Sequence, residues 1–156
     1  MRRNHLAVGA VAVALAGGWG VLRLGADEPR HVHGKAEMEK CVKECGRCAA
    51  ECASCFDHCT MLVSQGKKEH VRTLRTCVDC GDICAIAGKL TARHGALMGI
   101  VCEACAKACD ACGAECKKFP SDEHMKRCAD ACKDCAAACR EMVRVTGTEV
   151  TRGGAE

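Results

Sequence analysis

Cysteine sets the chemistry of this chain, with 18 cysteines among 156 residues. Six of them lie in the stretch CVKECGRCAAECASCFDHC, from Cys41 to Cys59, at steps of 4, 3, 4, 3 and 4 residues. Steps of 3 and 4 place side chains on one face of an α-helix. Thiols therefore stand where an amphipathic helix normally carries leucines.

Most of the cysteines form CxxxC pairs, whose Cβ atoms lie about 5–6 Å apart on a helix. Two thiolates at this separation can bind one metal ion, and the CxxC steps between pairs can link one site to the next. The pairs are Cys41/Cys45, Cys48/Cys52, Cys55/Cys59, Cys80/Cys84, Cys105/Cys109, Cys112/Cys116, Cys128/Cys132 and Cys135/Cys139. Cys77 and Cys102 complete the predicted set of metal ligands.

Soft thiolate ligands favour Cu(I), Zn(II) or iron–sulfur clusters. Iron–sulfur motifs gather cysteines in a loop that often ends in Cys-Pro, and no cysteine here precedes a proline. Zinc requires four ligands, which layers of four sulfurs in a helical bundle would also supply. Cu(I) accepts two or three sulfurs, as a helical pair and one neighbour provide, so the spacing favours many Cu(I) ions per subunit.

Other interpretations of the cysteines remain open. As a purely apolar core they would be weak, because cysteine buries less surface than leucine. A disulfide framework fits the even count, although helical spacing suits bridges poorly. A thiol–disulfide oxidoreductase would use a pair such as Cys77/Cys80, but redox cysteines need exposed, electropositive surroundings. A zinc-sequestering, metallothionein-like protein is the other alternative.

Four helical patterns position these thiols. The cysteine stripes predict helices over about residues 36–64, 68–94 and 96–118, and a fourth that starts after the segment FPSDEH at residues 119–124. Gly66 and Gly95 are the expected helix stops, and Ser121, after Pro120, is the expected cap of the last helix. Short connections make neighbouring helices antiparallel, so we predict an all-α, up-down-up-down four-helix bundle with a cysteine-lined core.

Glycines inside the predicted helices each cost about 1 kcal/mol relative to alanine. Gly46, Gly81, Gly88 and Gly113 occupy such positions, and three of them directly follow a cysteine. Close approach of neighbouring helices is one reason for keeping them.

The two ends of the predicted bundle differ. One end, called the mouth end below, brings together Met38, His94, Met98 and Met142. Their thioether and imidazole groups are candidate entry or end sites for metal, although methionine also fills bundle ends without a metal. The opposite, far end is more apolar and carries His124, one turn before Cys128, as a candidate end ligand or surface cap. We expect His31, His33 and His58 to be solvated.

Charge and aromatic content argue against a nucleic-acid partner. The formal net charge is +3, and residues 1–26 contribute three arginines and no acid, so the remainder is neutral. Phe56, Phe119 and Trp19 are the only aromatic residues, so there is neither a basic stripe nor a stacking platform.

Residues 1–26 have the composition of an export signal. Arg2 and Arg3 precede an apolar segment rich in glycine, as in bacterial twin-arginine signals, although His5-Leu6 follows where that pattern has Phe-Leu. A membrane anchor is the alternative, but the segment is short for a span. The predicted organisation is a signal over 1–26, a linker over 27–35, the bundle over 36–146 and a flexible tail over 147–156. This predicts a periplasmic protein that meets the membrane only during export, or a cytosolic one if the segment is not a signal.

The motifs CVKECGRCAAECASC, CVDCGDIC, CEACAKACDACGAEC and CADACKDCAAAC cover, with their loops, about residues 36–143 and resemble the bacterial copper storage proteins. The resemblance implies many Cu(I) ions held by the 18 inward cysteines and a tetramer of bundles. The function we expect is copper storage, for supply or detoxification, and not catalysis, because sites saturated by protein sulfur leave no open position for a substrate. Some members of that family are exported and others are cytosolic. The resemblance does not identify the protein that accepts the copper.

Overall fold

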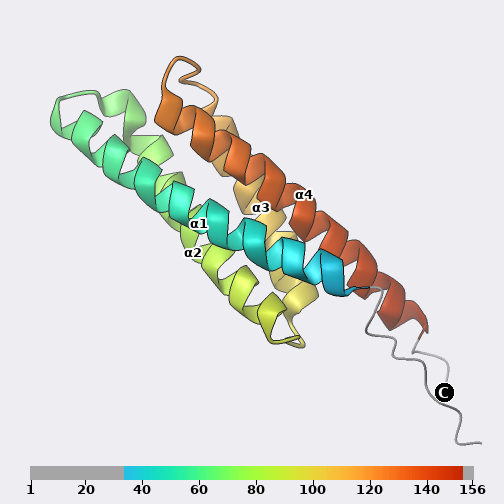
Figure 1. Cartoon of the computed structure of the whole chain (residues 1–156). Helices are drawn as coiled ribbons and strands as arrows, with labels where there is room; N and C mark the ends of the chain where they lie inside the picture. Colours follow the sequence, from blue (N-terminus) through green and yellow to red (C-terminus); the bar gives the residue numbers. More distant parts are fainter. Residues whose placement is uncertain (1–33, 153–156) are drawn as a thin grey trace, which may run out of the picture.

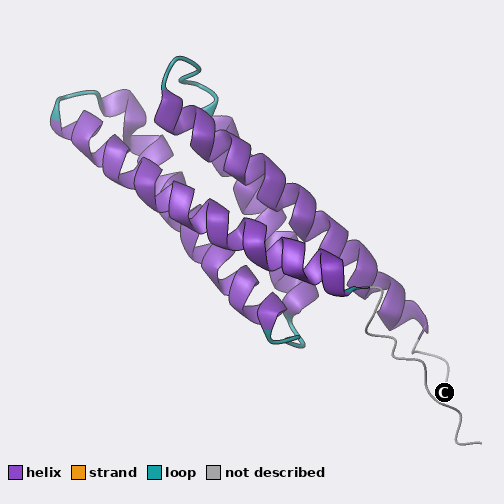
Figure 2. Cartoon of the chain, in the orientation of Figure 1, coloured by secondary structure: helices purple, strands orange, loops and turns teal. Residues whose placement is uncertain are grey.

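The computed structural model describes residues 34–152, which form a bundle of helices (Figure 1). Within this range no strand is present (Figure 2), so the predicted all-α class is confirmed. The elements are α1 (Lys35–Ser64), the short 3-10 helix η1 (Lys68–His70), α2 (Val71–Ala92), α3 (Met98–Cys116) and α4 (Glu123–Arg152).

The four long helices pack in a ring in which each contacts two neighbours. The contacting pairs are α1 with α2, α2 with α3, α3 with α4, and α4 with α1 (Figure 1). Because the connecting loops are short, consecutive helices run antiparallel. This is the predicted up-down-up-down bundle.

The loops end the helices largely as the sequence predicts, with one correction. Gly66 adopts a left-handed conformation, φ +88°, and follows Gln65, the C-cap residue of α1. At the end of α2, however, the left-handed residue is His94, φ 53°, and not the expected Gly95. Gly95 instead donates its backbone N–H to the carbonyl of Leu90 at 2.8 Å, as in a Schellman-type helix end.

The start and end of α4 also differ from expectation. Asp122, and not Ser121, caps the helix, because its Oδ1 accepts hydrogen bonds from the backbone amides of His124 and Met125 at 2.9 and 3.2 Å. The last turns continue to Arg152, so residues 147–152 of the expected flexible tail are helical. No proline follows Pro120 to interrupt this helix.

Three of the four glycines singled out in the sequence lie where two helices approach closely. A Cβ atom on Gly88 would lie 3.3 Å from the Cβ of Cys45, and one on Gly81 would lie 3.4 Å from that of Cys52. Gly113 has the same relation to Cys132 across the α3–α4 contact, also at 3.4 Å. Gly46 faces open space, so close packing does not account for it.

The core of the bundle consists mainly of sulfur. All 18 cysteines are buried, together with small alanines on α4 and a few larger side chains such as Leu62, Met125 and Met142. In residues 34–152, no helix combines the length and apolar character that crossing a membrane requires.

Candidate metal centre

The thiols form one continuous network along the bundle axis. All 18 cysteines are free, and each is at most 1% exposed. Thiols from different helices lie in contact, for example Cys84 with Cys109 at 3.5 Å between their Sγ atoms and Cys45 with Cys139 at 3.6 Å. The predicted inward stripes are therefore confirmed on every helix.

The contacts gather the thiols into groups of four whose Sγ atoms all lie within 4.8 Å of one another. Successive groups share members, such as Cys48, Cys52 and Cys128. Where two groups share none, direct contacts join them, as between Cys84 and Cys105 at 3.6 Å. The groups include Cys45/Cys105/Cys135/Cys139, Cys48/Cys80/Cys84/Cys109, Cys48/Cys52/Cys80/Cys132, Cys52/Cys112/Cys128/Cys132 and Cys55/Cys77/Cys116/Cys128.

These separations are close to what sulfur coordination of a metal demands. With a metal–sulfur bond of about 2.3 Å, two sulfurs lie about 4.6 Å apart in a linear site and about 4.0 Å apart in a trigonal one. Network contacts such as Cys48 with Cys109 and Cys41 with Cys102, both 3.9 Å, need to open only slightly to admit an ion. Because sulfurs are shared between groups, the network can hold a chain of ions.

Ionisation of these thiols is mutually linked. The pKa of Cys80 is lowered to about 7, chiefly by its hydrogen bond with Cys109, whereas the pKa of Cys84, one turn further, is raised, chiefly by Cys105. A thiolate that accepts hydrogen bonds from neighbouring thiols is stabilised, and those neighbours then lose their own protons less readily. Part of the network therefore stays protonated near neutral pH, and bound metal must displace those protons.

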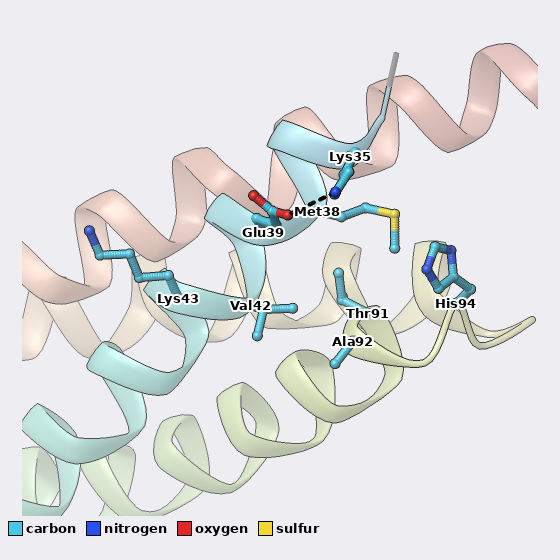
Figure 3. A pocket seen from close by; sticks show the side chains of 8 residues that line it. All are labelled: Lys35, Met38, Glu39, Val42, Lys43, Thr91, Ala92 and His94. Carbon is cyan, nitrogen blue, oxygen red and sulfur yellow. Dashed lines mark ion pairs between the residues drawn. The ribbon is translucent and has the colours of Figure 1, made fainter. Parts of the chain in front are cut away.

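The mouth end contains a cavity of about 430 Å³. Met38 from α1 and His94 from the end of α2 both line it, and Figure 3 shows the Met38 side chain extending towards the His94 ring. Met98, half-buried at the start of α3, and Met142, fully buried near the end of α4, lie at the same end of the bundle.

Thr91 also lines this cavity and separates it from the thiols. Its hydroxyl lies 3.5 Å from the Sγ atom of Cys102 and 3.9 Å from that of Cys41, the outermost thiols of α3 and α1. We did not predict this contact from the sequence. The available signal was a hydroxyl residue on the α2 stripe, where the other helices carry cysteine.

At the far end, His124 lies against another histidine. Its ring stacks on that of His58, with centroids 4.3 Å apart, and its Nδ1 lies 3.1 Å from the Arg127 guanidinium. The expectation that His58 is solvated is wrong, because its side chain is only 15% exposed and its Nε2 lies 2.7 Å from the Asp122 carboxylate. Burial opposes ionisation of Asp122, but His58 and two backbone amides together lower the pKa of this carboxyl.

Two further side chains at the far end were missed as possible functional groups. The Met125 Sδ atom accepts a hydrogen bond from the Cys55 thiol at 3.5 Å, and Met125 is fully buried. His70 is also buried, stacks on Phe119 with centroids 4.0 Å apart, and has no hydrogen-bond partner for its Nδ1 atom. Both lie on the helical stripes, where they resemble ordinary core residues in the sequence.

Comparisons with known proteins agree with this arrangement. The model of the family described as copper storage protein, Csp, matches residues 34–144. A curated relative, the uncharacterized cysteine-rich protein YhjQ of Bacillus subtilis (strain 168), is 37% identical over 87 residues, which are 54% of this chain and 81% of that protein.

Two solved structures have the same fold. The Cu(I)-bound copper storage protein BsCsp3 matches with a TM-score of 0.63 and 36% identity, over 69% of this chain and 98% of that one. A cytosolic copper storage protein from Streptomyces lividans, described with five coppers, matches with a TM-score of 0.64 and 34% identity, over 70% of this chain and 93% of that one.

Proposed function

The chain belongs to the copper storage protein family, and from that premise we propose that its 18 buried cysteines are the ligands of a multi-site Cu(I) store. The observation that carries the proposal is the series of buried four-sulfur groups in the core, which share members or lie in direct contact with one another. An ordinary apolar core needs no such sulfur network, and a single structural zinc site needs only four ligands.

Loading exchanges protons for copper. A Cu(I) ion that binds two thiols releases up to two protons and leaves a site with one net negative charge. Sharing a thiolate between two ions reduces that charge further, which favours bridged ions in a buried core. Copper ions thus occupy the core between the thiolates as the protein is loaded.

Competition between metals tests this assignment. The reduced protein is incubated anaerobically with equal concentrations of Cu(I) and Zn(II), and native mass spectrometry then counts each metal. We expect many coppers and essentially no zinc. Predominant zinc binding would favour a zinc-sequestering protein. Replacing Cys48, which belongs to two groups, with alanine should lower the copper count, whereas replacing the exposed Ser64 with alanine should not.

The mouth end is the proposed route for copper. The cavity lined by Met38 and His94 supports this route. Met98 and Met142 lie at the same end and are further candidate thioether ligands for the entering copper. His124 is the weaker candidate, because its ring packs against His58. Replacing both Met38 and His94 with alanine should slow copper uptake without lowering the final copper count, as measured by stopped-flow mixing with a coloured Cu(I) complex.

The family stores copper and is not described by a catalytic activity. We propose that this chain likewise stores copper and is not an enzyme. Buried thiols saturated by copper leave no open coordination position for a substrate. An insulin-reduction assay checks this proposal, and activity comparable to that of a thioredoxin would contradict it.

We further propose that residues 1–26 direct export to the periplasm, followed by a linker over residues 27–35. Residues 1–33 lie outside the described residues, and the Streptomyces lividans relative is described as cytosolic, so this proposal rests on the sequence. Cell fractionation tests it. Replacing Arg2 and Arg3 with lysine should retain the protein in the cytosol.

Assembly into a tetramer is also a proposal, supported by the family resemblance and by exposed apolar side chains at Ile86, Leu97 and Ile100. Light scattering coupled to size-exclusion chromatography measures the mass directly. A mass near 16.5 kDa would contradict assembly of the full chain.

A further inference from the structure

Met125 extends the sulfur network at the far end of the bundle. It lies on α4 one turn before Cys128, and its Sδ atom is 3.5 Å from the Sγ atom of Cys55. Cys55 and Cys128 both belong to a four-sulfur group with Cys77 and Cys116. The thioether therefore places a further sulfur atom beside this four-sulfur group.

The surrounding charge favours a neutral sulfur at this position. The carboxylate of Asp122, three residues before Met125, lies close to this position, because its Oδ1 atom accepts a hydrogen bond from the Met125 backbone amide at 3.2 Å. Another thiolate here would add negative charge close to that carboxylate. A thioether can bind Cu(I) without adding charge or requiring the loss of a proton.

The Met125 sulfur is also held in place by its surroundings. Its backbone amide donates to Asp122 Oδ1 at 3.2 Å, and Asp122 Oδ2 binds His58 on α1. This arrangement ties the start of α4 to the helix that carries Cys55. Because the side chain is fully buried, the thioether cannot exchange its thiol contact for solvent.

We propose that Met125 is a Cu(I) ligand that forms, with Cys55, a mixed thiolate–thioether site at the far end of the store. Binding of one Cu(I) ion releases the Cys55 proton and gives a neutral two-sulfur complex, with no change in oxidation state. The inference rests on the proposed function, because it adds an end site to the same store.

A Met125→Leu variant tests this site, with Met61→Leu as the matched control. Leucine keeps a similar volume but removes the sulfur. Met61 lies at the same end on α1, but its side chain is 50% exposed. Native mass spectrometry after anaerobic loading should find one Cu(I) fewer in Met125→Leu and the wild-type number in Met61→Leu. A Met125→Cys variant should restore the number and release one additional proton.

Methyl NMR provides a second measurement that does not require the variant to load copper. The reduced wild-type protein is labelled with [methyl-13C]methionine, and the signal missing from Met125→Leu identifies Met125. We expect this signal to shift as Cu(I) is added, while the Met61 signal stays in place. The proposed far-end site is wrong if wild type loads copper but the Met125 signal does not move. It is also wrong if Met125→Leu binds as many Cu(I) ions as the wild type. If wild type itself binds no copper, the storage function fails instead.

Discussion

At the scale of single residues, the protonation of buried thiols governs how the protein handles metal. Thiols in contact at 3.5–3.9 Å share protons, and copper must replace these protons when it binds. The positions of the cysteines were predictable, because a step of 3 or 4 residues fixes a face of a helix. The roles of Thr91 and His58 were not, because each depends on partners from distant parts of the chain, Cys102 and Cys41 in one case and Asp122 in the other.

Copper affinity should fall as the pH falls. Protons compete with Cu(I) for each thiolate, so a site that releases two protons loses up to about 100-fold in affinity per pH unit below the thiol pKa values. We therefore expect affinity to drop by about 10- to 100-fold between pH 7.5 and 6.5, where Cys80, with a pKa of about 7, also becomes protonated. Competition with a Cu(I) chelator calibrated at each pH measures this, and an affinity independent of pH would exclude thiolate exchange.

The hydroxyl of Thr91 should support the outermost thiols. The pKa of Cys41 is lowered first by Cys102, then by Cys139 and Cys45, and to a smaller extent by Thr91. A Thr91→Val variant loses one hydrogen bond, worth about 1 kcal/mol, so we expect the first copper to bind about 5-fold more weakly at unchanged total capacity. Chelator competition at low copper loading provides the measurement.

Thr73→Val is the matched control for this prediction. Thr73 is a buried threonine on the same helix, but its hydroxyl has no hydrogen-bond partner. Its replacement should leave copper binding unchanged and stabilise the apo protein by about 1 kcal/mol, because an unsatisfied buried hydroxyl is removed. Equal effects of the two variants on the first copper would show that the Thr91 contacts do not matter.

At the scale of helices, glycine allows pairs of helices to approach each other through their cysteines. Gly88 and Gly81 of α2 pack against the Cβ atoms of Cys45 and Cys52, and Gly113 of α3 packs against that of Cys132. The cysteine stripes were sufficient to predict the four helices and their approximate positions. They predicted the residues that end and cap the helices only in part. The sequence placed suitable stop and cap residues near the ends, but neighbouring His94 and Asp122 fill those roles because backbone geometry selects among adjacent candidates.

Two glycine-to-alanine variants should change the stability of the apo protein in opposite directions. Gly46→Ala adds a methyl group in open space, so we expect a stabilisation of about 1 kcal/mol from helix propensity. Gly88→Ala places a Cβ atom 3.3 Å from that of Cys45, which cannot move without its helix, so the same gain should be cancelled and the apo protein destabilised. Urea unfolding of both reduced apo variants measures the difference. Equal stabilisation of both would show that α1 and α2 are not in tight contact at Gly88.

At the scale of the whole molecule, the bundle encloses a long core that contains few large apolar side chains. Its shape followed from the sequence because four cysteine stripes joined by short loops admit few other packings. The cavity at the mouth end and the histidine pair at the far end depend on side-chain packing between helices, which the periodicity of a single helix does not specify.

Copper should stabilise the folded bundle strongly. Ions that bind the folded state better than the unfolded chain raise the melting temperature, and one site at a free copper concentration about 1,000 times its dissociation constant contributes about 4 kcal/mol. With several such sites, we expect the melting temperature to rise by about 10 °C or more. Anaerobic calorimetry of apo and loaded protein measures this shift, and equal melting temperatures would indicate that copper does not fill the core.

The most direct test of the store is an anaerobic titration of the reduced protein, without residues 1–26, in the presence of a coloured Cu(I) chelator. The number of ions taken up before the chelator develops colour gives the capacity. We predict an uptake on the order of one ion per cysteine, or somewhat fewer, because neighbouring ions share thiolates. Saturation after one or two ions would contradict the account, since a core with 18 connected sulfurs would then serve a single site.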